Sequence, residues 1–224
     1  CLYYLLLHCS YRCYIDNNFL NSSTIMKKIS KIIIGTHNRG KFKEISDLLP
    51  NNIKKISPEE LKLASPEETG QTFKENSEIK AKFFSKNSNL FCISDDSGLE
   101  IELLNGDPGI YSARWAQPEN NFDKAIMSVF EELKKKDLNW KIKKKIRARF
   151  VCCLSICWPN GKIISNIGKV NGKISSTKKG TNGFGYDPIF IPDGYEKTFA
   201  EMDQKLKYKI EKSNINLIGF HGHT

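Results

Sequence analysis

No apolar run in the sequence approaches the roughly 20 residues that a membrane-spanning helix needs. The apolar stretch at residues 2–7 is short for the core of a signal peptide, and no basic segment precedes it. The seven cysteines include no pair with the spacing of a zinc finger, and histidines number only four. These absences argue against a membrane span, a secretory signal and a zinc-finger module.

The cysteines are odd in number, and Cys152, Cys153 and Cys157 lie in or beside an apolar strand pattern. Disulfides belong to oxidising compartments, whereas cytosolic proteins keep their thiols reduced. We therefore expect free thiols and a cytoplasmic protein.

The chain is ordinary in composition but strongly basic. Of its 224 residues, 39% are hydrophobic and 11% are aromatic, and the formal net charge is +10. Such a charge favours contact with polyanions such as nucleotides, nucleic acids or acidic membranes, without deciding among them. Lysines gather at residues 134–136 and 141–145, and runs of this kind are more often solvated surface than docking sites.

Residues 1–25 differ in character from the rest of the chain. Met26 is followed at once by two lysines and then by an apolar strand pattern. We interpret Met26 as the natural start and residues 1–25 as a non-native N-terminal extension, which leaves 26–224 as a single two-lobed domain. Deleting residues 1–25 is then expected to leave activity unchanged.

The most informative stretch is Ile93–Leu99, with the sequence ISDDSGL. Strand-forming residues precede it at 90–93 and alternating apolar residues follow it at 99–104, so the pattern predicts a hairpin whose connection carries two carboxylates and a hydroxyl. Carboxylates beside a buried strand are costly unless they are partnered, and adjacent carboxylates often share a cation. An ordinary Asp/Gly turn is the alternative.

A glycine-rich loop joins the first predicted strand, residues 31–35, to a helix expected to end near Leu49. Backbone N–H groups and a helix N-terminus bind phosphate in this layout. The spacing of Gly35, Gly40 and Lys41 matches the start of a Walker A loop, but Phe42 stands where that motif needs Ser or Thr, so a P-loop NTPase is disfavoured. The candidate phosphate ligands of the loop are Thr36, Asn38 and Lys41.

Periodicity predicts the remaining elements. Thr72 and Glu75 form a capping box that opens a helix to about Lys86, with Asn76 and Lys80 on one side of it. These two residues face a cleft or are ordinary polar residues of the helix, and spacing leaves both open. A helix is further expected over 122–133, strands from 147 to 156 and from 163 to about 170, and a helix capped by Asp203.

The stretch Gly180–Phe190 reads GTNGFGYDPIF. Glycines flanking aromatic residues suit a loop in which the backbone approaches a planar ligand and a ring stacks on it. An aspartate beside that ring can accept from the N–H groups of a base. An aromatic-rich turn is the alternative.

Taken in order, six motifs resemble those of the Ham1-type (RdgB/inosine triphosphatase) nucleoside-triphosphate pyrophosphatases: THNRGK, EETG-x-TF-x-EN-x-x-x-KA, SDDSGLE, PGIYSARWA, GFGYDPIF and FAEM. The resemblance implies an α/β fold, with an elongated mixed β-sheet flanked by helices and two lobes around a central nucleotide-binding cleft. It implies Mg2+-dependent hydrolysis of non-canonical purine nucleoside triphosphates (ITP, dITP and XTP) to the monophosphate and pyrophosphate, which cleans the nucleotide pool. It further implies a homodimer, with no nucleic-acid or membrane partner.

The resemblance also implies roles for individual residues. Asp96 is expected to be the general base and a magnesium ligand, and Glu67 the second metal carboxylate, with Glu68 a close rival because a one-residue shift exchanges them. Magnesium prefers such carboxylate oxygens together with phosphate oxygens. The residues expected to bind the triphosphate are Thr36, Asn38, Lys41 and Ser97. Those expected at the base are Phe184, Gly185, Tyr186 and Asp187, with Lys207 reaching the substrate.

One motif of the family is missing. The family has Ser-His-Arg shortly after its lysine, here Lys207, and its His and Arg contact the base. This chain reads YKIEKSN at 208–214 instead. The C-terminal tail is therefore atypical, and purine selectivity and turnover are the properties that it puts in question.

Three alternatives stand beside this interpretation. A Maf-type pyrophosphatase of other base preference is disfavoured by the GFGYD and EETG segments. A basic nucleic-acid-binding module explains the net charge but not the carboxylates at 67, 95 and 96, which repel phosphate unless a cation intervenes. An inactive nucleotide-binding protein is the hypothesis that the altered tail favours.

Overall fold

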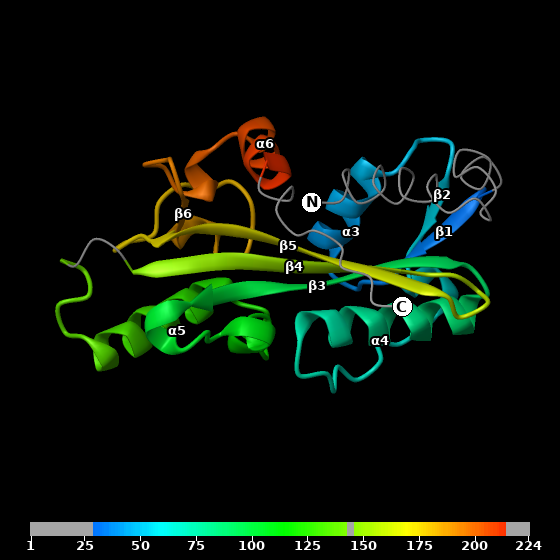
Figure 1. Ribbon diagram of the computed structural model, residues 1–224, viewed down its shortest axis with the longest axis horizontal. Helices are drawn as coiled ribbons and strands as arrows, with labels where there is room; N and C mark the ends of the chain where they lie inside the picture. Colours follow the sequence, from blue (N-terminus) through cyan, green and yellow to red (C-terminus); the bar gives the residue numbers. More distant parts are fainter. Residues whose placement is uncertain (1–28, 143–145, 214–224) are drawn as a thin grey trace, which may run out of the picture. The chain divides into compact units, whose positions relative to one another are not determined.

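The computed structural model describes residues 29–142 and 146–213. Six strands form one sheet in the order β2-β1-β3-β4-β5-β6. The sheet is mixed, because β1 pairs in parallel with both β2 and β3 whereas β5 and β6 pair antiparallel. With helices packed on the sheet (Figure 1), the expected α/β fold is confirmed.

The strands are β1 (Lys31–Ile34), β2 (Lys54–Ile56), β3 (Phe91–Ile101), β4 (Arg147–Cys157), β5 (Ile163–Ile174) and β6 (Phe190–Pro192). The α-helices are α3 (Arg39–Leu48), α4 (Phe73–Ser88), α5 (Phe122–Lys136) and α6 (Gln204–Ser213). Short 3-10 turns are η1 (Glu59–Leu61), η2 (Glu102–Leu104), η3 (Gly109–Tyr111), η4 (Arg114–Ala116), η5 (Asp187–Ile189) and η6 (Phe199–Glu201).

The chain divides into two units, with the boundaries inside β3, β4 and β5. Among described residues, the first unit contains 29–96 and 153–167, and the second contains 97–142, 146–152 and 168–213. The expectation of a single two-lobed domain over 26–224 stays a prediction. The proposed extension at 1–25 and the tail beyond 213 lie outside the described residues.

In the first unit, α3 and α4 lie on opposite faces of the parallel strands (Figure 1). The core between α4 and the sheet includes Ile33, Phe84 and Cys92, all fully buried. Packing around Gly35 leaves no room for a side chain, because a Cβ there would lie 2.1 Å from the Ser94 hydroxyl oxygen and 2.6 Å from the Phe84 ring. The glycine thus lets the end of β1 approach β3.

The second unit has a larger core, built from α5, the second half of β3 and an aromatic group. Phe150, Phe190 and Phe199 pack with ring centroids 4.6–6.0 Å apart. Ala125, Ile126, Val129 and Leu133 form the buried face of α5, as their helical spacing predicts. This face fixes the helix on the sheet.

The hairpin predicted around residues 95–98 is wrong. β3 is one continuous strand from Phe91 to Ile101, and Asp95 and Asp96 lie inside it, both buried. The polar residues are tolerated there because lysine and amide side chains from other elements partner them. The strand therefore places its carboxylates on a rigid element rather than in a turn.

Candidate active site

The glycine loop after β1 is held in place by its own side chains. Asn38 caps α3, and its Oδ1 accepts from the backbone N–H groups of Gly40 (2.9 Å) and Lys41 (3.2 Å). The Thr36 hydroxyl oxygen accepts from the N–H of Asn38 at 3.2 Å. These side chains occupy the N–H groups of Asn38, Gly40 and Lys41, so what the loop offers an anion is the positive dipole end of α3.

The parallel pairing of β1 with β3 brings this loop level with the two aspartates. Ile34 is the partner of Ile93, so the residues that follow Ile34 run beside Ser94 and Asp95. Gly35 confirms the register, since its N–H donates to the Ile93 carbonyl at 2.7 Å. The loop thus begins at the carboxyl end of β1, the kind of position at which open α/β sheets bind ligands, while β3 continues past it to Ile101.

Lys41 lies in an ion pair with Asp95, at 2.7 Å between Nζ and Oδ2. The carboxylate is buried and the lysine is largely buried. The predicted phosphate ligand Lys41 and the first aspartate of the motif are therefore direct partners. The ion pair compensates a carboxylate that burial alone would disfavour.

Asp96 is surrounded by side chains of α4. Lys80 lies 3.8 Å from its Oδ1, and Asn76 donates from Nδ2 to its Oδ2 at 3.1 Å. Lys80 also contacts Glu68 at 2.5 Å. The structure thus joins Asn76 and Lys80 to the carboxylates, a role that their helical spacing left open.

Of the two candidate metal carboxylates, Glu68 is the one beside this group. Lys80 connects it to Asp96, and Glu68 is half-buried, whereas Glu67 is exposed. Further along the loop, Gly70 is anchored by its N–H to Asn76. The geometry therefore favours the rival assignment over Glu67.

The pKa of Asp96 is raised to about 6, chiefly by burial and also by the neighbouring Glu68 carboxylate. Lys80, Lys41 and the Asn76 hydrogen bond oppose this effect and lower the pKa. A carboxyl group whose pKa lies near neutrality is suited to accept a proton during catalysis.

The oxygen donors of this group fit a hard cation. Within 29–142 and 146–213, no three or more His, Cys, Asp or Glu side chains gather as a complete metal cage. Magnesium rarely uses such cages, since it binds through one or two carboxylates together with substrate phosphates and water. Glu68 and Asp96, which both lie within reach of the Lys80 ammonium, are the pair that such an ion would use.

In the second unit, the loop before η5 is organised around Asp187. Its Oδ2 accepts from the N–H of Phe184 at 3.1 Å and pairs with the Lys207 ammonium at 2.7 Å. Gly183 has a positive φ of 76°, and a Cβ there would lie 2.0 Å from the same oxygen, so the turn requires glycine. Asp187 is buried, which makes it the anchor of the loop.

Phe184 is 39% exposed, with the Lys207 ammonium 5.5 Å from its ring centroid. An exposed aromatic ring next to a held cation can stack on a planar ligand and contact its anionic part. Gly185, with φ of 66°, turns the chain directly after the ring.

Tyr186, placed in the same loop, points into the protein. Its side chain is 3% exposed, its hydroxyl donates to the Ser112 carbonyl at 2.9 Å, and its ring packs edge-on against Phe122. Burial raises the pKa of this phenol. Tyr186 therefore supports the loop, and Ser112 is a partner that no sequence signal indicated.

Ser97 follows Asp96 in β3 and is half-buried.

The four described cysteines, Cys92, Cys152, Cys153 and Cys157, are free thiols, in agreement with the expectation. None of the helices in the described part of the chain is long and apolar enough to cross a membrane.

Comparison with known proteins points to one family. The model of the Ham1 family matches residues 32–215. A dITP/XTP pyrophosphatase of Zymomonas mobilis is 42% identical over 80% of this chain and 85% of its own length, and that of Rhodospirillum centenum is 44% identical over 80% and 87%. A solved Ham1 protein from Coxiella burnetii is 34% identical, covers 84% of this chain and 94% of its own, and superposes with a TM-score of 0.73. The family match spans both units, and with it the buried aspartates, the glycine loop and the aromatic loop: the chain belongs to the Ham1 family.

Proposed function

We propose that this chain is a nucleoside-triphosphate pyrophosphatase that hydrolyses the non-canonical purine nucleotides ITP, dITP and XTP to the monophosphate and pyrophosphate. The observation that carries the proposal is the buried Asp96 of β3, held by Lys80 and Asn76 beside Glu68, close to the start of the glycine loop. Relatives about 40% identical over most of the chain bear the name of this activity.

Each residue group has a part of the nucleotide assigned to it. The glycine loop binds the triphosphate through the Thr36 hydroxyl, the Asn38 side-chain amide and the Lys41 ammonium, at the positive end of α3. Ser97 follows in β3 as a further phosphate contact. Phe184 and Gly185 bind the base, and Asp187 holds Lys207 toward the substrate while Tyr186 fixes the loop.

Asp96 acts as the general base. It takes a proton from the attacking water, whose oxygen bonds to the α-phosphorus while the bond to the bridging oxygen breaks and pyrophosphate leaves. Its raised pKa, about 6, leaves it ionised at neutral pH yet basic enough to accept the proton. The two oxygens of Asp96 have different partners: Oδ1 faces the Lys80 ammonium, and Oδ2 accepts from the Asn76 amide.

Glu68 and Asp96 are the residues that would hold Mg2+, which supplies neutralisation of charge on the pyrophosphate that leaves. Glu68 replaces Glu67 as the second metal carboxylate, because it is the residue in contact with Lys80. We further propose a homodimer that works in the cytoplasm on the nucleotide pool, a compartment in keeping with the free thiols.

The test is pyrophosphate release from ITP, dITP, XTP, GTP and ATP, with Mg2+ and with EDTA. The proposal expects kcat/KM for the first three to exceed that for ATP at least tenfold, with no release in EDTA. Comparable rates for ATP would contradict the base preference. Nucleotide binding without any release would favour the inactive binder that the altered tail suggested.

A further inference from the structure

Asn76 is a fully buried amide on α4 whose two ends serve two different partners. Its Nδ2 donates to Asp96 Oδ2 at 3.1 Å, and its Oδ1 accepts from the backbone N–H of Gly70 at 2.9 Å. A side-chain amide can donate to one group through its nitrogen and accept from another through its oxygen, and it then bridges the two groups. Here the amide joins the loop that carries Glu68 to the strand that carries Asp96.

The loop is shaped to meet this amide. Gly70 lies two residues after Glu68, and a Cβ at Gly70 would stand 2.6 Å from Asn76 Oδ1 and 2.9 Å from the Asn76 N atom. The loop backbone therefore reaches the amide because residue 70 has no side chain. Lys80, one turn further along α4, contacts Glu68 of the same loop at 2.5 Å.

The two oxygens of the Asp96 carboxylate contact different side chains. Oδ2 accepts from Asn76, whereas Oδ1 is the oxygen that faces Lys80, whose ammonium also contacts Glu68. One amide thus fixes the orientation of Asp96 and the backbone position two residues from Glu68. Hydrogen-bond partners of this kind orient metal-binding carboxylates.

We propose that Asn76 is a positioning residue that sets the spacing of Glu68 and Asp96 for cation binding and turnover. The proposal rests on the proposed function in assigning those carboxylates to a divalent cation. It gives Asn76 no contact with the substrate and no proton to transfer.

The same helix offers a matched control. Ser85 is also buried on α4, and its hydroxyl donates to the carbonyls of Leu90 (2.7 Å) and Cys157 (3.3 Å), away from the carboxylates. Ser85→Ala removes buried hydrogen bonds without touching the Asp96 group. A role of Asn76 in folding alone would make its variants behave like this control.

The experiment compares wild type, Asn76→Ala, the milder Asn76→Ser and Ser85→Ala, each checked by circular dichroism for a folded state. Binding of Mn2+ alone is measured from the loss of the free-ion electron paramagnetic resonance signal, and turnover of dITP is measured at saturating Mg2+. For Asn76→Ala we expect the Mn2+ dissociation constant to rise and kcat to fall by about 10- to 100-fold, with KM changed less than about threefold. Asn76→Ser falls between this variant and wild type, and Ser85→Ala matches wild type in both measurements.

Wild-type Mn2+ affinity and kcat in folded Asn76→Ala would overturn the positioning role, as would an equal loss in Ser85→Ala. A wild-type protein that releases no pyrophosphate from dITP would instead overturn the proposed function. In that case the Mn2+ titrations alone still decide whether Asn76 sets the spacing of the carboxylates.

Discussion

At the scale of single residues, the environment of Asp96 determines its chemistry. The side chain is only 6% exposed, and burial outweighs the effect of Lys80 and Lys41 on its pKa. A charged carboxylate in this position is unfavourable for the metal-free protein, whereas it is useful for accepting a proton. Function and stability therefore place opposite demands on this residue.

Asp96→Asn removes the proton acceptor while keeping nearly the same volume. We expect kcat for dITP to fall by about 10^2- to 10^4-fold, the usual contribution of a general base. The amide fits the same space, so the circular dichroism spectrum should match that of wild type. A variant that retains more than a tenth of the wild-type kcat would remove Asp96 from this role.

The raised pKa also predicts how stability depends on pH. Because the folded state binds the Asp96 proton more tightly than the unfolded state, Asp96 lowers the free energy of unfolding as pH rises from about 4 through about 6. Asp96→Asn lacks this loss. In EDTA, its stability relative to wild type should increase by about 1–3 kcal/mol between pH 4.5 and pH 7.5, measured by urea unfolding. An unchanged difference would mean that the folded state leaves the Asp96 pKa unshifted.

Phe184 is exposed enough to stack on a base, and stacking on an aromatic side chain contributes about 1–3 kcal/mol. We expect Phe184→Ala to raise KM for ITP and for XTP together by about tenfold, since every purine presents a ring face. Tyr111→Ala is the matched control, because Tyr111 is an aromatic residue of the same unit with 45% exposure. Equal KM values for Phe184→Ala and wild type would exclude the stacking role.

At the scale of elements, the helices were predicted correctly, whereas the strand β3 was mistaken for a hairpin. The helices followed from local signals. The Thr72 hydroxyl accepts from the Glu75 N–H at 3.1 Å and α4 begins at Phe73, as predicted, while the Glu75 carboxylate accepts from the Gln71 N–H instead of completing the capping box at Thr72. The hairpin failed because a run of polar residues looks like a turn unless its partners are known. Those partners, Lys41 and Asn76, lie far from the aspartates in sequence.

The same limit applied to the candidate site. The motifs indicated Thr36, Asn38, Lys41 and Asp96, since these residue types at this spacing suit phosphate and metal. The proposed preference for Glu68 over Glu67 rests on the position of Lys80, and the Tyr186 hydroxyl is bonded to Ser112, 74 residues away. Contacts at such separations leave no periodic signal in one sequence.

The junction of β1 and β3 makes a prediction for Gly35→Ala. The added methyl would overlap Ser94 and Phe84, so we expect the free energy of unfolding to fall by about 1–3 kcal/mol. We also expect KM for dITP to rise, because the overlap displaces the loop that binds the triphosphate. The comparison is Gly161→Ala in the turn between β4 and β5, where space is open but φ is 86°. Backbone strain alone should cost that variant about 1 kcal/mol and leave KM unchanged. Equal KM values for the two variants would contradict a role of the glycine loop in substrate binding.

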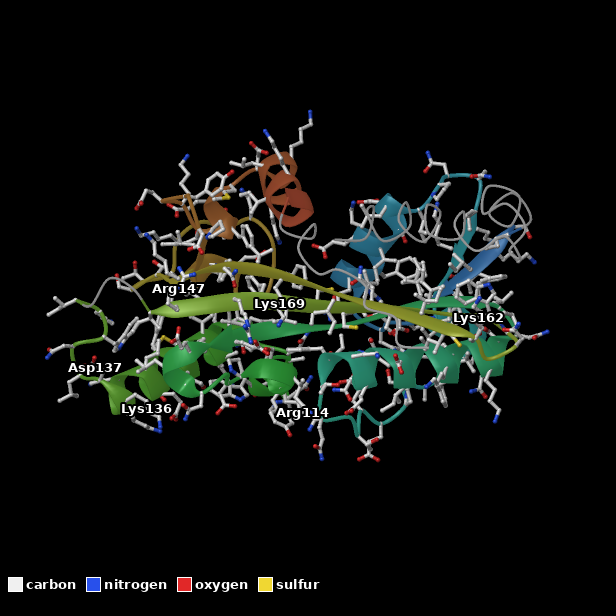
Figure 2. All side chains as sticks on the ribbon, viewed as in Figure 1. Arg114, Lys136, Asp137, Arg147, Lys162 and Lys169 are labelled. Atoms are coloured by element: carbon white, nitrogen blue, oxygen red, sulfur yellow. The ribbon has the colours of Figure 1, made fainter. Side chains whose placement is uncertain are left out.

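At the scale of the whole molecule, the net charge of +10 raises the question of a polyanionic partner. The basic side chains labelled in Figure 2 come from different elements, with Arg114 in η4, Lys136 at the end of α5 and Lys162 between β4 and β5. Arg147, also labelled there, forms an exposed ion pair with Asp193, and Lys135 forms one with Glu132. Exposed, ion-paired basic side chains of this kind are typical of a solvated surface.

We therefore expect nucleic acid to bind this protein weakly and without specificity. In fluorescence anisotropy with a mixed-sequence DNA duplex and a single-stranded RNA, dissociation constants should exceed about 10 μM at 0.15 M salt and rise steeply with further salt, as counterion release requires. Turnover of dITP should be unaffected by either polymer at 1 μM. A dissociation constant below 1 μM that persists at 0.3 M salt would contradict this expectation, because contacts to phosphate alone weaken at that ionic strength. Such a result would assign the excess of lysine to a nucleic-acid-binding surface.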